Sequence, residues 1–116
     1  MGRVLQVRLM AYTFAEDDVR KAWPLLWNWA FEETRPGFPM EMKGVLELVR
    51  ALDELYQFGD IPDSLRKVLA GFLPEAVAGV EELQRQLADW NPKAANVASD
   101  RIEDALSELE KHTPKP

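Results

Sequence analysis

The sequence predicts a mainly α-helical fold, with four or five helices in one compact domain and a single N-terminal β-strand. Apolar residues recur at helical spacing through most of the chain, whereas only one segment alternates as a strand does. Prolines, glycines and capping residues divide the helical pattern into segments. The length of 116 residues, 47% of them hydrophobic, fits a single domain, residues 1–116, with one core.

Residues 4–12 form the predicted strand. Leu5, Val7, Leu9 and Ala11 are separated by single residues, which is typical of a strand with one buried face. A lone strand leaves its backbone N–H and C=O groups unpaired. We therefore expect it to pair with an irregular segment or with its own copy across a dimer; otherwise the segment is a helix.

Residues 14–33 are predicted to form one kinked helix. Thr13-Phe14-Ala15-Glu16 matches the capping-box pattern, and Glu16-Asp17-Asp18 places negative charge at the positive end of the helix dipole. Pro24 removes a helical hydrogen bond, so the helix must kink there or stop at Ala22 and restart with Pro24 in its first turn. The kink is favoured because tryptophan is a poor N-cap.

Four further helices follow the break at Pro36-Gly37, over residues 40–58, 62–71, 74–90 and 92–111. Gly59 is placed to stop the first of them. Gly71 and Pro74 separate the second from the third. Asn91-Pro92, an N-cap followed by proline, starts the last helix, and residues 112–116 form a frayed tail.

Composition and charge exclude several classes of protein. The net charge is −6, and all the excess acid lies in residues 51–116, which disfavours nucleic acid. A solvated acidic exterior explains this charge, with a basic protein partner as the alternative. The chain has no cysteine, so disulfides and cysteine–zinc sites are excluded. No apolar run is long enough to span a membrane, so no membrane association is expected, and the cytoplasm is the predicted location.

No catalytic, cofactor-binding or metal-binding constellation is readable, and we expect a protein that is not an enzyme. His112 is the only histidine, and with Glu108 it supplies two metal ligands at best. The acidic doublets, such as Glu103-Asp104, point about 100° apart on a helix and are interpreted as solvated faces. Gly79 lies inside a predicted helix, where it permits close helix packing.

The candidate binding residues are Trp23, Trp27, Trp29 and Phe31. On one helix they belong to an apolar sector about 200° wide, broader than a surface helix needs. Burial at the centre of the fold explains most of this sector. A second interpretation leaves the flank near Trp29 open to a second subunit or another protein. A third is a pocket walled by Trp23, Trp27 and Tyr56 for an apolar or cationic ligand.

These observations predict a small acidic helical protein that acts as a protein–protein interaction or scaffold module, with a protein partner or a second copy of itself in a homodimer. The alternative is a small-molecule-binding protein with a tryptophan-lined pocket. No cofactor is expected in either case.

Overall fold

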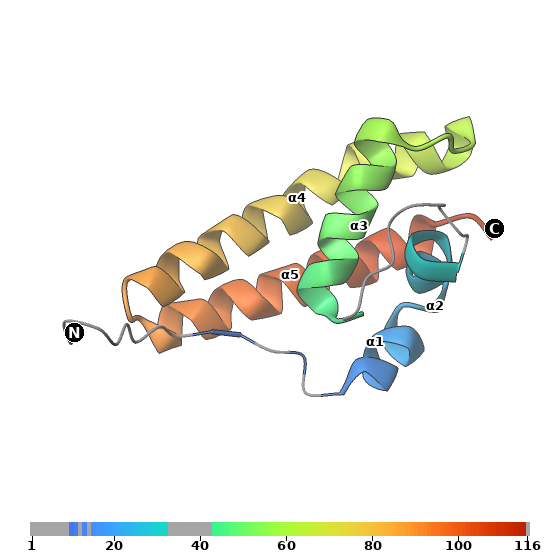
Figure 1. Ribbon diagram of the computed structural model, residues 1–116. Helices are drawn as coiled ribbons and strands as arrows, with labels where there is room; N and C mark the ends of the chain where they lie inside the picture. Colours follow the sequence, from blue (N-terminus) through green and yellow to red (C-terminus); the bar gives the residue numbers. More distant parts are fainter. Residues whose placement is uncertain (1–9, 12, 14, 33–42, 116) are drawn as a thin grey trace.

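The computed structural model describes residues 10–11, 13, 15–32 and 43–115, and the mainly helical class is confirmed (Figure 1). The elements in chain order are α1 (Glu16–Ala22), α2 (Pro24–Trp27), the π-helical turn η1 (Asn28–Glu32), α3 (Val45–Phe58), α4 (Asp63–Ala88) and α5 (Pro92–His112). No helix in these ranges is both long and apolar enough to cross a membrane.

The predicted strand over residues 4–12 finds no support in the described residues. Met10 and Ala11 are the part of it that the structure describes, and neither lies in a strand. The remaining positions of that segment lie outside the described residues. Pairing of this segment across a dimer therefore stays a prediction.

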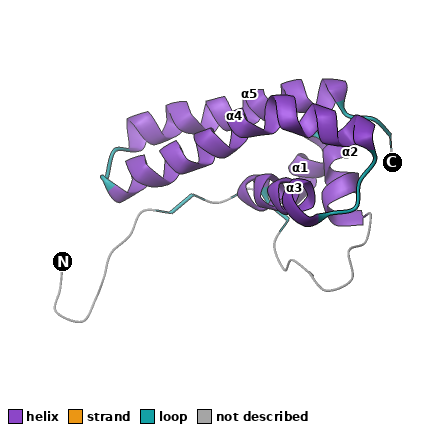
Figure 2. Cartoon of the chain, turned by 90° about the horizontal axis from the view of Figure 1, so that it is seen from above, coloured by secondary structure: helices purple, strands orange, loops and turns teal. Residues whose placement is uncertain are grey.

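Helices α4 and α5 form a long antiparallel hairpin, whose two arms lie side by side in both views (Figures 1 and 2). Their contact is the most extensive between elements in the described part of the chain. Gly79 makes the close approach possible, since a Cβ atom there would lie 2.7 Å from Cγ1 of Ile102. The expected role of this glycine in helix packing is thus confirmed.

The prediction of two helices separated at Gly71 and Pro74 is wrong, because α4 runs through both positions. Proline removes the hydrogen bond to the carbonyl four residues earlier, here that of Ala70. Ala70 and Pro74 are both exposed, so water can reach this carbonyl. Leu69 and Leu73 on the opposite face are buried, and their packing keeps the helix continuous.

The kink predicted within residues 14–33 is also wrong: the chain leaves the helix at Trp23 and restarts at Pro24. Trp23 has φ −133° and ψ 66°, outside the helical region, and Pro24 occupies the first turn of α2. The side chain of Trp23 accepts no hydrogen bond at the start of α2, and a residue far along the chain supplies the acceptor instead. The carboxylate of Glu110 in α5 accepts hydrogen bonds from the backbone N–H groups of Leu25 at 3.1 Å and Leu26 at 2.9 Å.

The boundaries of α3 and α5 follow local signals. Gly59 is the residue that ends α3, as predicted, although the helix begins at Val45 and residues 40–42 lie outside the described residues. The side chain of Asn91 caps α5 as predicted, accepting a hydrogen bond from the N–H of Ala94 at 3.2 Å.

The prediction of a frayed tail over residues 112–116 is wrong for its first residues. His112 still belongs to α5, and Thr113 is buried, with its hydroxyl donating a hydrogen bond of 2.6 Å to the carbonyl of Leu109. The carbonyl of Pro114 accepts a hydrogen bond from Trp29. The chain that follows α5 is therefore packed against the aromatic segment, residues 23–29.

The core lies where α2, α3 and the two long helices meet. Its fully buried leucines come from four helices, so burial of apolar surface is what holds these elements together. They are Leu26, Leu48, Leu52, Leu65, Leu69, Leu106 and Leu109.

Candidate functional site

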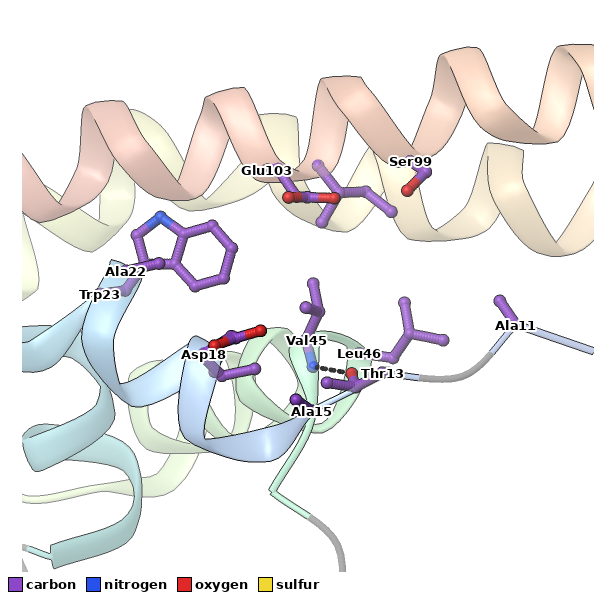
Figure 3. Close-up of a pocket in the computed structure, with 12 residues that line it drawn as sticks. Ala11, Thr13, Ala15, Asp18, Ala22, Trp23, Val45, Leu46, Ser99 and Glu103 are labelled. Carbon is purple, nitrogen blue, oxygen red and sulfur yellow. Dashed lines mark hydrogen bonds between the residues drawn. The ribbon is translucent and has the colours of Figure 1, made fainter.

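A pocket of about 360 Å³ lies between the segment that precedes α1, helix α1 itself, the first turn of α3 and the middle of α5 (Figure 3). Its lining is mostly apolar, with a few polar groups. The lining residues are Ala11, Thr13, Ala15, Asp18, Val19, Ala22, Trp23, Val45, Leu46, Ser99, Ile102 and Glu103. Pockets that bind small molecules commonly have this size and composition.

Two hydrogen bonds join Thr13, which precedes α1, and Glu16, the first residue of α1, to the start of α3 beside the pocket. The hydroxyl of Thr13 accepts a hydrogen bond of 2.8 Å from the N–H of Val45, and the carboxylate of Glu16 accepts one of 2.9 Å from the N–H of Lys43. Thr13 and Glu16 therefore satisfy donors at the start of α3. The predicted capping box at the start of α1 is wrong, since the N-cap there is Ala15, which has no side-chain hydrogen bond.

Gly44 makes this arrangement possible. It is the N-cap of α3 and carries no side chain, so the hydroxyl of Thr13 takes the position that a capping side chain would occupy. A Cβ atom on Gly44 would overlap this hydroxyl. The N–H of Gly44 donates in turn to the carboxylate of Glu47 at 3.2 Å.

The ring of Trp23 forms a further part of the wall and is held in a fixed position. Only 5% of the residue is exposed, and its indole N–H donates a hydrogen bond of 3.1 Å to the hydroxyl of Ser107. Val19 and Ile102, which are both buried, complete the apolar floor. The break in the helix at Trp23 thus places an ordered aromatic ring beside the cavity.

Among the described residues of the lining, the charged side chains are Asp18 from α1 and Glu103 from α5. Figure 3 shows the two side chains on opposite sides of the cavity, Asp18 on α1 and Glu103 on α5. Both residues are exposed to solvent. The described lining therefore combines buried apolar side chains with two exposed acidic ones.

The structure places the four predicted binding residues in different surroundings. Trp29 is buried at 7% exposure, and its indole N–H donates a hydrogen bond of 2.8 Å to the carbonyl of Pro114. The flank near Trp29 is thus part of the core in this structure, in agreement with the burial interpretation. Trp23 lines the pocket, whereas Trp27 and Phe31 are half-buried outside it.

Trp27 and Phe31 form an aromatic pair on the surface. Their ring centroids are 5.7 Å apart in an edge-to-face arrangement. The guanidinium of Arg20 and the ammonium of Lys43 lie 4.9 Å and 5.1 Å from the centroid of Trp27. Phe31 belongs to the π-helical turn η1, and such turns are rare and frequently found at functional sites.

Of the three rings predicted to wall a pocket, Trp23 lines the described cavity, whereas Trp27 and Tyr56 are not among its lining residues. Tyr56 belongs to the last turns of α3, away from the pocket. Its ring packs under the guanidinium of Arg66, at 5.6 Å, and this guanidinium also donates a hydrogen bond to the Tyr56 carbonyl. Only the Trp23 part of this prediction coincides with the cavity.

Metal-binding groups do not converge in the part of the chain that the structure describes, where no cluster of three or more suitable side chains occurs. The ring of His112 stacks on Phe72, with centroids 4.7 Å apart. Glu108 pairs with Lys111 at 2.9 Å, and the hydrogen bond from Lys111 lowers the pKa of this carboxyl group. His112 and Glu108 thus have separate contacts.

Sequence reasoning missed Asp18, Ser99 and Glu103 as pocket residues. Asp18 has a local role at the start of a helix, and Glu103 belongs to an acidic doublet typical of a solvated face. No local signal relates positions so far apart in the chain. The fold alone brings them to one cavity.

No protein-family model matches this chain, and neither the curated proteins nor the solved structures include a significant match.

Proposed function

We propose that this protein is a non-enzymatic binding protein whose ligand is a small molecule held in the pocket between α1, α3 and α5. The observation that carries the proposal is a cavity of about 360 Å³ with the fixed ring of Trp23 in its wall. An apolar floor with a small number of polar groups is the usual composition of a small-molecule site. The absence of cysteine suits a reducing cytoplasm, which we propose as the location.

A variant that fills the pocket tests the proposal. Val45 lines the cavity from the first turn of α3, so Val45→Phe is expected to place a larger side chain in it. In a thermal-shift screen of a metabolite library, we expect at least one compound to raise the Tm of the wild type, because a ligand that binds only the folded state stabilises it. The same compound should not raise the Tm of Val45→Phe.

The matched control is Val97→Phe, which makes the same change at a residue that is 67% exposed on α5 and outside the pocket. This variant should keep the ligand response of the wild type. A compound that stabilises Val45→Phe as much as the wild type binds elsewhere and contradicts the proposal, as does a library without a single stabilising compound.

A protein-binding role, which the sequence favours, is the second candidate, and the surface pair Trp27–Phe31 supports it. Tryptophan and arginine are enriched at the energetic centres of protein interfaces, and here both lie at the same surface. The partner is another protein or a second copy of this chain in a homodimer.

Replacing Phe31 by alanine tests this second candidate. We expect Phe31→Ala to lose partners that the wild type captures in a pull-down, or to lower the concentration-dependent dimer mass measured by light scattering. Phe58→Ala is the control, because Phe58 is 88% exposed and lies at the end of α3. A wild type that is monomeric at all concentrations, with the same captured proteins as folded Phe31→Ala, contradicts this candidate.

A further inference from the structure

We infer that the ligand of the pocket carries a positively charged amino group on an apolar stem, which lies between the carboxylates of Asp18 and Glu103 and against the ring of Trp23. This inference rests on the proposed function, because it specifies the chemical class of the ligand for the same pocket. It follows from the charge of the lining, the contacts of the two carboxylates and the composition of the floor.

The described residues of the lining carry charge of one sign. Asp18 and Glu103 are acidic, and no lysine or arginine is among the described residues that line the cavity. Of the polar lining groups, the hydroxyl of Thr13 is already engaged with the N–H of Val45. The pocket thus repels an anionic ligand and attracts a cation, particularly at low ionic strength.

Neither carboxylate has a cationic partner among the described residues. Other acidic side chains near α5 do have one: Glu75 is bound by Arg101 at 2.5 Å, and Glu108 by Lys111 at 2.9 Å. Asp18 and Glu103 take part in none of the ion pairs or side-chain hydrogen bonds that join the described residues. They face one cavity from opposite sides, so a cation between them is attracted by both carboxylates (Figure 3).

The rest of the pocket suits an amine with a hydrocarbon stem. The ring of Trp23 lines the cavity and adds aromatic surface to the apolar part of the lining. Val19, Ile102 and Leu46 provide apolar contacts for the stem. A small inorganic cation would leave this apolar surface unused, so the geometry points to an organic ammonium group.

Titrations with three probes of equal chain length test the inference. Hexylamine, hexanol and hexanoate are added to the isotopically labelled protein, and the indole N–H signal of Trp23 is followed by NMR. The two carboxylates attract the ammonium group of hexylamine and repel the carboxylate of hexanoate. Because water screens both exposed carboxylates, we expect hexylamine to bind only about ten-fold more tightly than hexanol, and hexanoate to bind more weakly than either. The preference for the amine should fall in Asp18→Asn and in Glu103→Gln and disappear in the double variant.

Asp17→Asn and Asp104→Asn are the matched controls, because they remove neighbouring charges that do not line the pocket. They should keep the preference. If hexylamine and hexanol bind equally and both shift the Trp23 signal, the amine inference is overturned while the pocket stands. If no probe shifts it, the amine inference is overturned too, and the library screen with Val45→Phe decides separately whether the pocket binds ligands.

A last arm distinguishes the source of the amino group. A short capped peptide containing lysine is compared with the same peptide containing norleucine and with hexylamine. Tighter binding of the lysine peptide than of hexylamine assigns the amino group to the side chain of a protein, whereas tighter binding of hexylamine assigns it to a free small molecule. Binding of the norleucine peptide as tightly as the lysine peptide overturns the inference.

Discussion

Replacing Trp29 by alanine is expected to lower the free energy of unfolding by about 3–5 kcal/mol, the range for truncation of a large buried aromatic side chain. The ring is 7% exposed and belongs to the core cluster, and its indole N–H is bonded to the Pro114 carbonyl. Truncation leaves a cavity and removes that bond. Urea denaturation followed by circular dichroism measures the change.

Trp90→Ala is the matched control, since Trp90 lies in the turn between α4 and α5 and is 54% exposed. We expect its effect on the free energy of unfolding to stay within about 0.5 kcal/mol. A Trp29→Ala protein that is as stable as Trp90→Ala would show that the ring of Trp29 is not part of the core, and the interpretation of this flank as a partner surface would return.

Replacing Glu110 by alanine is expected to destabilise the protein by about 1–3 kcal/mol, because two partly buried N–H groups lose a charged acceptor. These are the N–H groups of Leu25 and Leu26 at the start of α2. We expect their amide hydrogens to exchange faster with solvent, ahead of those in the middle of α4. Chemical denaturation and hydrogen exchange by NMR measure the two effects.

Glu108→Ala is the control for this prediction. It removes a carboxylate two residues away on the same helix, whose exposed ion pair with Lys111 contributes little. Equal stability of Glu110→Ala and Glu108→Ala, with unchanged exchange at Leu25 and Leu26, would mean that the carboxylate of Glu110 does not hold α2.

The elements that the sequence predicts correctly are those whose signals are local. Asn91 and Pro92 start α5 through a hydrogen bond to a residue three positions on, and Gly59 ends α3. The spacing of apolar residues in α3 likewise predicts its buried face, including Leu48, Leu52 and Leu55. These features depend on a few neighbouring residues, so a sequence contains them directly.

The predictions that are wrong concern residues whose partners lie far along the chain. Thr13 satisfies an N–H group 32 positions later, and Glu110 satisfies N–H groups 84 and 85 positions earlier. The continuity of α4 through Pro74 depends on packing of its buried face, which outweighs the local cost of proline. Each of these outcomes is decided by tertiary contacts that local patterns do not contain.

The candidate site was accessible to sequence reasoning only in part. The cluster of tryptophans in the sequence indicates Trp23, which lines the pocket, and equally Trp29, which does not. Both rings are buried, and no local pattern tells which of them borders a cavity. The carboxylates of Asp18 and Glu103 resemble every other exposed acid in the chain. Their shared cavity is a property of the fold, since residues of α1 and α5 line it together.

The polar partners of the aromatic segment have a consequence for folding during synthesis. The indole N–H of Trp23 donates to the hydroxyl of Ser107, and the indole N–H of Trp29 donates to the carbonyl of Pro114. The backbone N–H groups of Leu25 and Leu26 donate to the carboxylate of Glu110. A ribosome makes these partners more than seventy residues after the donors. These hydrogen bonds can therefore form only after residues 107–114 have emerged from the ribosome, and until then the two indole N–H groups lack the acceptors that they have in the folded protein.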